Sequence, residues 1–430
     1  MINKYDAYKD SGIDWVGKIP AHWNVLKLGG IFEQRNQKVS DKDYPALSVT
    51  KNGIVPQLDN AAKTKDGDNR KLVLKGDFVI NSRSDRKGSS GLSSLDGSVS
   101  LINIVLKPRK IEPKFSHHLM KCNAFIEEYY RVGRGIVADL WTTRFEEMKT
   151  MNLALPSVKE QRQIADFLDQ RLVEIDQAIA IKEQQIALLN ERKQIVIQKA
   201  VTQGLNPNVA LKDSGVEWIG EIPEHWITKK FKYAMSIKAR LGWKGLKADE
   251  YVDNSEYGFL STPNIKHQNI KYDECYFITQ RRYEESPEIM LEDGDILLVK
   301  DGSTLGISNI VKNLPFKCTV NSSIAVLRKF QKEQYLPSFL NYYLKTSSIQ
   351  NHIKLVKDGM GVPHLFQSDI KNFVLIIPPI IEQEQIIEFI EYEVEKIDTG
   401  ISLIEDQIQK MKEYKTTLIN DAVTGKIKVA

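Results

Sequence analysis

Two histidines stand in matching contexts and are the first candidates for chemistry. His22 precedes Trp23, His225 precedes Trp226, and a proline lies two residues before each histidine. Nucleophilic catalysis would require a serine or cysteine close to the imidazole, and neither context supplies one at a recognisable spacing. We therefore expect the Pro-x-His-Trp turns to be structural, with both tryptophans packed in a local core.

Other polar motifs also give no catalytic centre or metal site. Cys122, Cys275 and Cys318 are isolated, and the seven histidines show no metal-ligand spacing. The sequence has no GxxxxGK[ST] phosphate loop and no carboxylate-lysine cluster typical of nucleases. These patterns predict a chain without catalysis, metal or cofactor of its own.

Basic loops rich in glycine and serine follow two matching segments. Residues 73–83 and 291–302 each predict a turn and then a buried strand that ends in polar residues. Such loops bring backbone amides and cations close to phosphates, and their polar side chains can bond base edges. A solvated surface turn is the alternative. Residues 238–245 interleave cations with Trp243, which indicates either a nucleic-acid contact or a buried tryptophan anchor.

The elements that position these loops are duplicated. Residues 9–23 recur as residues 212–226, with 10 of 15 positions identical. Leu155-Pro156-Ser157-Val158-Lys159-Glu160-Gln161 is echoed by Ile377-Pro378-Pro379-Ile380-Ile381-Glu382-Gln383. Each echo opens a long helical segment, so the chain is a repeat of a globular part and a helix.

Both helical segments carry apolar residues at alternating spacings of three and four, which indicates a seam that faces another helix. The predicted seam positions are Leu168, Leu172, Ile175, Ile179, Ile186 and Leu189 in the first segment, and Ile390, Val394, Ile397, Ile401, Ile408 and Met411 in the second. Lys193 and Lys415 also fall on the seam. Quasi-twofold symmetry makes the two helices antiparallel if they pair within one chain. Packing of each seam on its own domain or on another chain is the alternative.

Helix boundaries are marked by recognisable signals. Ser157 and Glu160 form a capping box, and Gly204 and Gly425 stand where a helix end favours a left-handed residue. We expect an α+β chain with domains at residues 1–156, 157–205, 206–378 and 379–425, in which the first and third are globular and the others are spacer helices.

Composition excludes several protein classes. The chain has 430 residues, 42% hydrophobic and 27% charged, which is typical of two or three folded domains. Its longest apolar run is about nine residues, whereas a membrane span needs about twenty. The N-terminus lacks an apolar signal region, and the isolated cysteines suit a reducing compartment. We expect a cytoplasmic protein that does not contact membrane.

Charge separates the globular parts from the second helix. Residues 1–156 hold 25 Lys and Arg against 18 Asp and Glu, a net charge of +7. Residues 379–425 hold 4 against 11, a net charge of −7. A basic globular part suits a polyanion, although a solvated surface would have the same composition.

Taken together, these motifs give the whole chain a resemblance to the DNA-specificity subunit, or S subunit, of type I restriction-modification systems. The resemblance rests on Trp15-x-Gly17-x-Ile19-Pro20-x-His22-Trp23, its repeat at residues 218–226, and the Pro-x-x-x-Glu-Gln helix starts. Pro379 departs from the pattern where the first copy has the cap residue Ser157. The resemblance implies two target recognition domains that each read one half of a bipartite, asymmetric DNA target. Two long antiparallel coiled-coil helices join them and act as a ruler.

The resemblance also implies partners and sites. Two modification subunits would methylate adenine N6, and restriction subunits with translocase and endonuclease activity would complete the complex. Catalysis and cofactors would reside in those partners. Double-stranded DNA would contact Lys51, Asn81, Arg83, Arg86, Lys87, Arg134, Arg240, Trp243, Lys244, Asn264, Lys266, Lys300, Ser303, Thr304 and Lys357.

Two other functions remain open on the sequence. A stand-alone two-domain DNA-binding or architectural protein would have no methyltransferase partners. An enzyme in its own right would need a cofactor site, and Asn313-Leu314-Pro315-Phe316 only partly matches the Asn-Pro-Pro-Tyr/Phe loop of amino-methyltransferases. Methylation that appears only with partner chains would separate these alternatives from the specificity-subunit interpretation.

Overall fold

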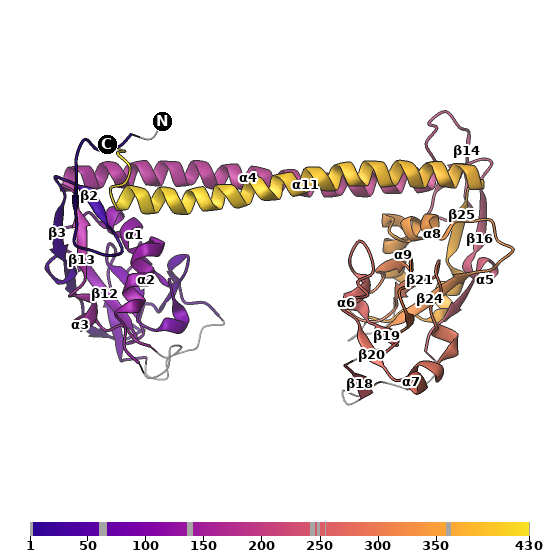
Figure 1. Cartoon of the computed structure of the whole chain (residues 1–430), viewed down its shortest axis with the longest axis horizontal. Coiled ribbons are helices and arrows are strands. Elements are labelled where there is room, and N and C mark those ends of the chain that lie inside the picture. The colour runs from indigo at the N-terminus through magenta and orange to yellow at the C-terminus, as the bar shows by residue number, and fades with distance from the viewer. Residues whose placement is uncertain are drawn as a thin grey trace. The chain divides into compact units, whose positions relative to one another are not determined.

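The structure is a computed structural model, and it describes residues 3–59, 67–135, 141–240, 246, 250–253, 255–357 and 363–429. The chain divides into two compact units. The first contains residues 1–183 and 404–430, and the second contains residues 184–403. Each unit contains one globular domain and parts of two long helices (Figure 1).

The globular domain of the first unit consists of small antiparallel sheets and short helices. Its central sheet has the strand order β10-β9-β12-β4, and β3 pairs with β13 beside the start of the first long helix. The strands are β1 (Tyr8–Asp10), β2 (Lys18–Pro20), β3 (Asn24–Lys27), β4 (Phe32–Gln34), β5 (Lys38–Val39), β6 (Leu47–Thr50), β7 (Gly53–Pro56), β8 (Arg70–Val73), β9 (Phe78–Asn81), β10 (Ser90–Leu92), β11 (Gly97–Val99), β12 (Asn103–Pro108) and β13 (Asn152–Leu155). The helices are α1 (Pro113–Lys121), α2 (Asn123–Arg131) and α3 (Phe145–Met148).

The globular domain of the second unit repeats this framework. Its sheet β17-β24-β21-β22 matches the central sheet of the first domain, and β16 pairs with β25 as β3 pairs with β13. The strands are β14 (Leu211–Asp213), β15 (Glu221–Pro223), β16 (Ile227–Lys230), β17 (Met235–Lys238), β18 (Tyr251–Val252), β19 (Tyr257–Leu260), β20 (Tyr276–Ile278), β21 (Ile296–Val299), β22 (Ser308–Ile310), β23 (Lys317–Val320), β24 (Ile324–Lys329) and β25 (Val374–Ile377). The helices are α5 (Phe231–Ala234), α6 (Thr262–Ile265), α7 (Gln280–Glu284), α8 (Pro337–Leu344), α9 (Ser347–Val356) and α10 (Gln367–Asn372). The predicted α+β repeat is confirmed.

A buried aspartate fixes the turn before each central strand. Asp77 accepts a hydrogen bond from Arg35 Nε at 2.7 Å, and Asp295 accepts one from Arg328 Nε at 2.7 Å. Each carboxylate also accepts the backbone N–H three residues before it. The repeated Gly-Asp pair is therefore a structural element of the framework, because its charge is both paired and hydrogen-bonded.

The long helices α4 (Val158–Gln203) and α11 (Ile380–Val423) pair in antiparallel fashion, as predicted (Figure 1). In the first unit, Lys415 Nζ lies 2.6 Å from Asp176 Oδ1, and Lys182 Nζ lies 2.5 Å from Gln407 Oε1. Partner numbers fall along α11 as they rise along α4, which defines the antiparallel direction.

Burial along both helices follows the predicted seam. Leu168 and Ile390 are fully buried, whereas Ile181 and Leu188, which lie off the seam, are 56% and 63% exposed. All twelve predicted seam residues are buried or half-buried. The spacing of three and four therefore marks the buried face of each helix. Near the start of α11 this face also packs on its own domain, because Ile390 and Val394 belong to the core cluster that contains Phe339 and Leu340.

The start of α4 is tied to the Pro-x-His-Trp turn. Glu160 accepts hydrogen bonds from Tyr5 Oη at 2.8 Å and Trp23 Nε1 at 3.2 Å, and its other oxygen lies 2.8 Å from His22 Nε2. Ser157 Oγ accepts the backbone N–H of Glu160, so half of the predicted capping box forms. The Glu160 carboxylate does not complete the box because it bonds Tyr5, His22 and Trp23 instead.

The second unit repeats this arrangement at the start of α11. Glu382 Oε2 lies 2.8 Å from His225 Nε2 and accepts a hydrogen bond from Trp226 Nε1 at 3.0 Å. Both tryptophans are fully buried, as predicted. Gly204 and Gly425 have φ values of 74°, which confirms the left-handed helix ends.

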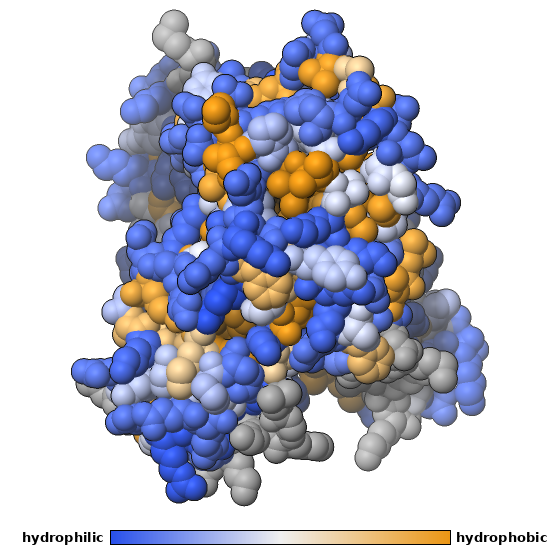
Figure 2. Space-filling view, turned by 90° about the vertical axis from the view of Figure 1, so that its right-hand side faces the viewer, coloured by the Kyte–Doolittle hydropathy of each residue, from blue (hydrophilic) through white to orange (hydrophobic). Residues whose placement is uncertain are grey.

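Polar and apolar side chains are interspersed on the surface of the second unit. Figure 2 shows several separate hydrophobic patches among hydrophilic side chains on the face turned to the viewer. Within the described ranges, no helix combines the length and apolar composition needed to cross a membrane.

Candidate nucleic-acid interface

A cleft of about 610 Å³ lies in the first globular domain, between the β6–β7 hairpin and one end of the central sheet. Three residues predicted to contact DNA, Lys51, Asn81 and Arg86, line this cleft together. Lys51 and Arg86 are exposed, whereas Asn81 is buried. The other lining residues are Leu47, Ser48, Val49, Thr50, Gln57, Leu58, Arg70, Asp85, Ser89, Ser100, Ile102 and Asn103. Exposed cations above buried polar groups suit a phosphate-bearing ligand whose bases are also contacted.

Asn81 and Asn103 are cross-strand neighbours within this cleft. They are paired in the β9–β12 register, and their exposures are 6% and 4%. Val79 and Val105 are the next residues on the same face, and they pack in an apolar cluster with Leu47. The two amides therefore lie where the apolar core of the domain ends.

Other predicted contacts of the first domain lie beside this cleft. Arg83 and Arg134 are exposed, and the backbone of each pairs with that of Thr142 in a single β-bridge. Lys87 belongs to a neighbouring pocket, where its Nζ lies 2.5 Å from Glu127 Oε2. The bridges hold Arg83 and Arg134 in one loop region.

In the second domain, Arg240 and Lys300 line a shared pocket of about 370 Å³ with His364 and Phe366. Lys300 Nζ lies 2.6 Å from Asp301 Oδ2, and the other Asp301 oxygen contacts His364 Nδ1. Two cations, a histidine and an exposed aromatic ring therefore share one surface.

Arg240 packs against neighbouring residues in this pocket. Its guanidinium lies over the Phe259 ring, 5.6 Å from the centroid, and donates to the Val320 carbonyl at 3.4 Å. Burial lowers the pKa of Arg240, and the neighbouring Arg282 lowers it further. The side chain stays a cation because the ordinary pKa of arginine is so high.

The remaining predicted residues of the second domain are not gathered in one place. Asn264 is buried, and its amide bonds Ser261 and the Lys271 carbonyl within its own turn, so its polar atoms are already used. Lys266 lines another cleft, beside Lys345 and residues of both long helices. Ser303, Thr304 and Lys357 lie in turns or at a helix end. Trp243 and Lys244 lie outside the described residues.

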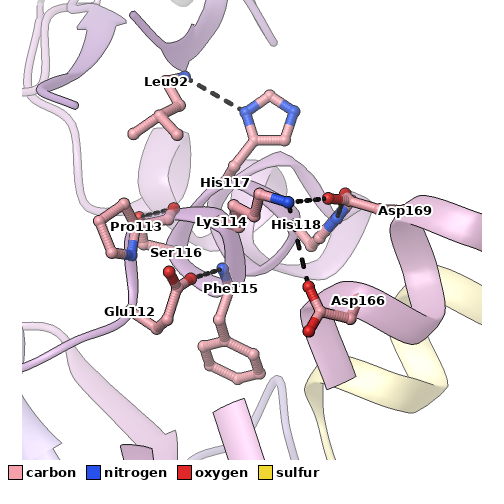
Figure 3. Close-up of polar contacts among 10 residues, drawn as sticks. All are labelled: Leu92, Glu112, Pro113, Lys114, Phe115, Ser116, His117, His118, Asp166 and Asp169. Carbon is pink, nitrogen blue, oxygen red and sulfur yellow. Dashed lines mark hydrogen bonds and ion pairs between the residues drawn. The ribbon is translucent and has the colours of Figure 1, made fainter. Parts of the chain in front are cut away.

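Ion pairs fix the first domain on the long helix that follows it. Figure 3 shows Lys114 and His118 of α1 converging on Asp169 of α4, at 2.9 and 2.8 Å, with Asp166 3.9 Å from Lys114. Burial alone would raise the pKa of Asp169, but the hydrogen bonds from Lys114 and His118 outweigh it and lower the pKa. The Asp169 carboxylate therefore stays charged and holds α1 against α4.

His117, next to these ion pairs, bonds the sheet instead. Its Nδ1 accepts the Leu92 backbone N–H at 3.2 Å (Figure 3). Burial lowers the pKa of His117 to about 4, and the neighbouring His118 and Lys121 add to the shift. At neutral pH the imidazole is uncharged, which keeps this ring nitrogen free to accept.

A family model, the type I restriction modification DNA specificity domain, matches residues 20–191 and 242–412. The chain belongs to this family. As a specificity subunit, it recognises DNA, assembles with other subunits of a restriction-modification complex and leaves catalysis to them.

Similar specificity subunits match along almost the whole chain. The type I restriction enzyme MjaVIII specificity subunit of Methanocaldococcus jannaschii is 22% identical over 431 residues, which cover 96% of this chain and 94% of that protein. The EcoDI specificity subunit of Escherichia coli is 22% identical over 441 residues, which cover 96% and 90%.

Solved structures share the fold. A chain from a structure that addresses complex assembly and conformational transition of the type I R-M system has a TM-score of 0.70 at 15% identity, with 94% of this chain and 98% of that chain covered. The HsdS subunit from Thermoanaerobacter tengcongensis has a TM-score of 0.53 at 15% identity, with 95% and 98% covered. At these identities the likeness concerns the fold alone.

Several lining residues of the two specificity-domain clefts were not predicted from the sequence. Arg70 and Asn103 in the first domain, and His364 and Phe366 in the second, join residues that were. One available signal was Asn103, a polar residue directly before the apolar residues Ile104, Val105 and Leu106 of β12. The strand register that brings it opposite Asn81 is not visible in sequence.

Proposed function

We propose that each globular domain reads one half of an asymmetric bipartite DNA target through the clefts described above. In the first domain, Lys51, Arg83 and Arg86 would contact phosphates and Asn81 the bases. In the second domain, Arg240 and Lys300 would contact DNA at the pocket that they line with His364. Residues 1–156 and 206–378 are the recognition domains in this proposal, and residues 157–205 and 379–425 are the spacer helices.

One observation supports this proposal more than any other. The two domains share a framework, yet the equivalent ends of their central strands differ, with Asn81 opposite Asn103 in the first domain and Val299 opposite Ile324 in the second. A duplicated framework with different side chains at equivalent positions suits two different half-sites, because side chains read base edges and the framework does not.

The proposal includes the partner arrangement. Two modification subunits that methylate adenine N6 would assemble on the helices and the adjoining domain surfaces, and restriction subunits would complete the complex. The helices would set the distance between the two half-sites. We also propose a cytoplasmic location, where the chain would meet the DNA that it recognises.

Mapping of modified adenines in host DNA, with the chain present and with its gene deleted, tests the proposal. Loss of a single asymmetric bipartite motif on deletion is the expected result. A stand-alone DNA-binding protein would leave the methylation pattern unchanged while the partner subunits are expressed. That outcome would contradict the proposal.

A further inference from the structure

Resting on the proposed function, a more specific role can be assigned to the two amides of the first-domain cleft. Asn81 and Asn103 are buried side by side at its floor, and the contacts of each fix the direction in which its amide points. These contacts leave one amide donor, on Asn81, and one amide acceptor, on Asn103, for a ligand.

The orientation of Asn81 is set by the backbone. Its Oδ1 accepts the Arg83 N–H at 3.0 Å, so the oxygen is turned toward the loop. The amino group of Asn81 has no hydrogen-bond partner in the part of the chain that the structure describes. Asn81 therefore leaves a donor.

Asn103 is fixed in the opposite sense. Its Nδ2 donates to the Ser100 carbonyl at 3.2 Å and to Ser100 Oγ at 3.0 Å, and only an amino group can donate to a carbonyl. Its Oδ1 is buried and has no hydrogen-bond partner among the described residues. A buried acceptor without a partner destabilises the folded domain, so Asn103 is costly unless a ligand bonds it.

The second domain shows that the framework does not need these amides. The same register position pairs Val299 with Ile324, and both pack in an apolar cluster with Leu260 and Val320. The apolar pair satisfies the fold at no polar cost. Stability therefore explains the local bonds of the two amides, whereas binding would explain the unpaired Asn103 oxygen beside the Asn81 amino group.

We propose that Asn81 and Asn103 together read an adenine in the half-site recognised by the first domain. The major-groove edge of adenine offers an acceptor, N7, beside a donor, the N6 amino group. Asn81 supplies the matching donor and Asn103 the matching acceptor. Guanine offers two acceptors on this edge and would leave Asn103 opposite an oxygen or nitrogen lone pair.

The test exchanges the amides for the pair that the chain already uses in its second domain. The chain carrying Asn81→Val and Asn103→Ile is expressed with its partner subunits, and modified adenines are mapped in the host DNA. We expect the half-site read by the second domain to be unchanged and one A·T position of the other half-site to become degenerate. Preference for that A·T pair should fall on the order of tenfold to a hundredfold in methylation rates on matched duplexes.

Controls separate this inference from the proposed function. Lys107→Ala changes an exposed residue of β12 outside the cleft and should leave the motif intact. A wild-type chain that directs no bipartite methylation would overturn the proposed function and the inference with it. The inference alone would be overturned if the double variant retained the wild-type motif. A change at a G·C pair or in the other half-site would overturn it as well.

The single variants cover a failure of the double variant to fold. If the double variant directs no methylation, Asn81→Val and Asn103→Ile are each mapped in the same way. Degeneracy at one A·T position in either variant supports the adenine contact. Retention of the wild-type motif by both overturns it.

Discussion

Lys193 of α4 donates hydrogen bonds to both carboxylate oxygens of Asp398 of α11, at 2.7 and 2.8 Å. The first unit contains the same pair with the helices exchanged, because Lys415 of α11 bonds Asp176 of α4. The lysines that interrupt each apolar seam therefore have partners on the opposite helix. A slipped register would separate each half-buried lysine from its partner carboxylate, so the pairs favour one alignment of the helices.

The charge pair at Lys193 should be measurable as a coupling free energy. Lys193→Asp places two carboxylates together and should lower the stability of the second unit, whereas combining it with Asp398→Lys should restore part of the loss. We expect a coupling of about 0.5–3 kcal/mol in a double-mutant cycle from thermal unfolding. Additive effects of the two single variants would show that the pair does not set the register.

Much of the scaffold could be predicted because its signals are local. The seam follows from residue spacing along one helix, and Gly204 and Gly425 mark helix ends through their need for positive φ. The absence of a nearby nucleophile in the sequence predicts a structural role for the turn of His22 and Trp23. Its bonds to Glu160 required the structure, since 137 residues separate Trp23 from that carboxylate.

The interface could be predicted only by region. Its cleft gathers residues from β6, β8, β9 and β12, and strand register decides which of them meet. Asn264 illustrates the limit, because its side chain accepts the backbone N–H of Ser261, the residue that precedes its own helix α6. Asn103 illustrates the opposite case, because only the strand register reveals that it lies opposite Asn81.

The two left-handed helix ends should differ in their tolerance of alanine. A Cβ on Gly425 would lie 2.8 Å from Pro20 Cγ, whereas one on Gly204 would lie 3.0 Å from the more movable Glu382 Oε1. Gly220 has a similar φ of 75° and no atom within 4 Å of a Cβ, so Gly220→Ala isolates the backbone cost. We expect destabilisation of about 1–2 kcal/mol there and roughly 1–3 kcal/mol more for Gly425→Ala. Thermal unfolding of the three variants orders them, and equal losses would contradict the close packing at Pro20.

His117 should make the first unit sensitive to acid. Its pKa is about 4 in the folded chain, whereas an unfolded histidine titrates near pH 6.5. Between these values the unfolded state binds more protons, so the free energy of unfolding falls as the pH falls from 6.5 to 4. The loss from this residue is about 3 kcal/mol.

Substitution of His117 by asparagine should flatten this acid profile. Asparagine can accept the Leu92 N–H, and Asn341 occupies the same position of α8, counted from the proline that begins each helix. Thermal unfolding of both proteins at pH 7 and pH 5 gives the comparison. An equal loss of stability in the two would show that His117 does not cause the acid sensitivity.

Arg86 should contribute to DNA affinity without reading sequence. Its exposed guanidinium stands on the rim of the first-domain cleft, as expected of a phosphate contact. Arg86→Ala should weaken binding to all sequences and reduce the slope of log affinity against log salt by about one. Arg109→Ala removes the same charge from a residue outside the cleft, paired with Glu33, and should leave the slope unchanged. Titrations of target DNA at several salt concentrations decide between a phosphate contact and a distant surface charge.

The length of the paired helices should set the spacer of the DNA target without affecting its half-sites. One heptad inserted after Glu183 in α4, with another after Leu403 in α11, preserves the seam and adds about 10 Å, because an α-helix rises 1.5 Å per residue. At 3.4 Å per base pair this rise corresponds to roughly three base pairs. We expect mapped methylation to retain both half-sites with a longer spacer. The methylation rate should be lower, because three additional base pairs rotate one half-site about the DNA axis, whereas a heptad nearly restores the helix face.

A four-residue insertion at the same places interrupts the seam and should lower thermal stability instead. Altered half-sites in the heptad variant would mean that the helices influence base recognition, and an unchanged spacer would mean that they do not set the distance.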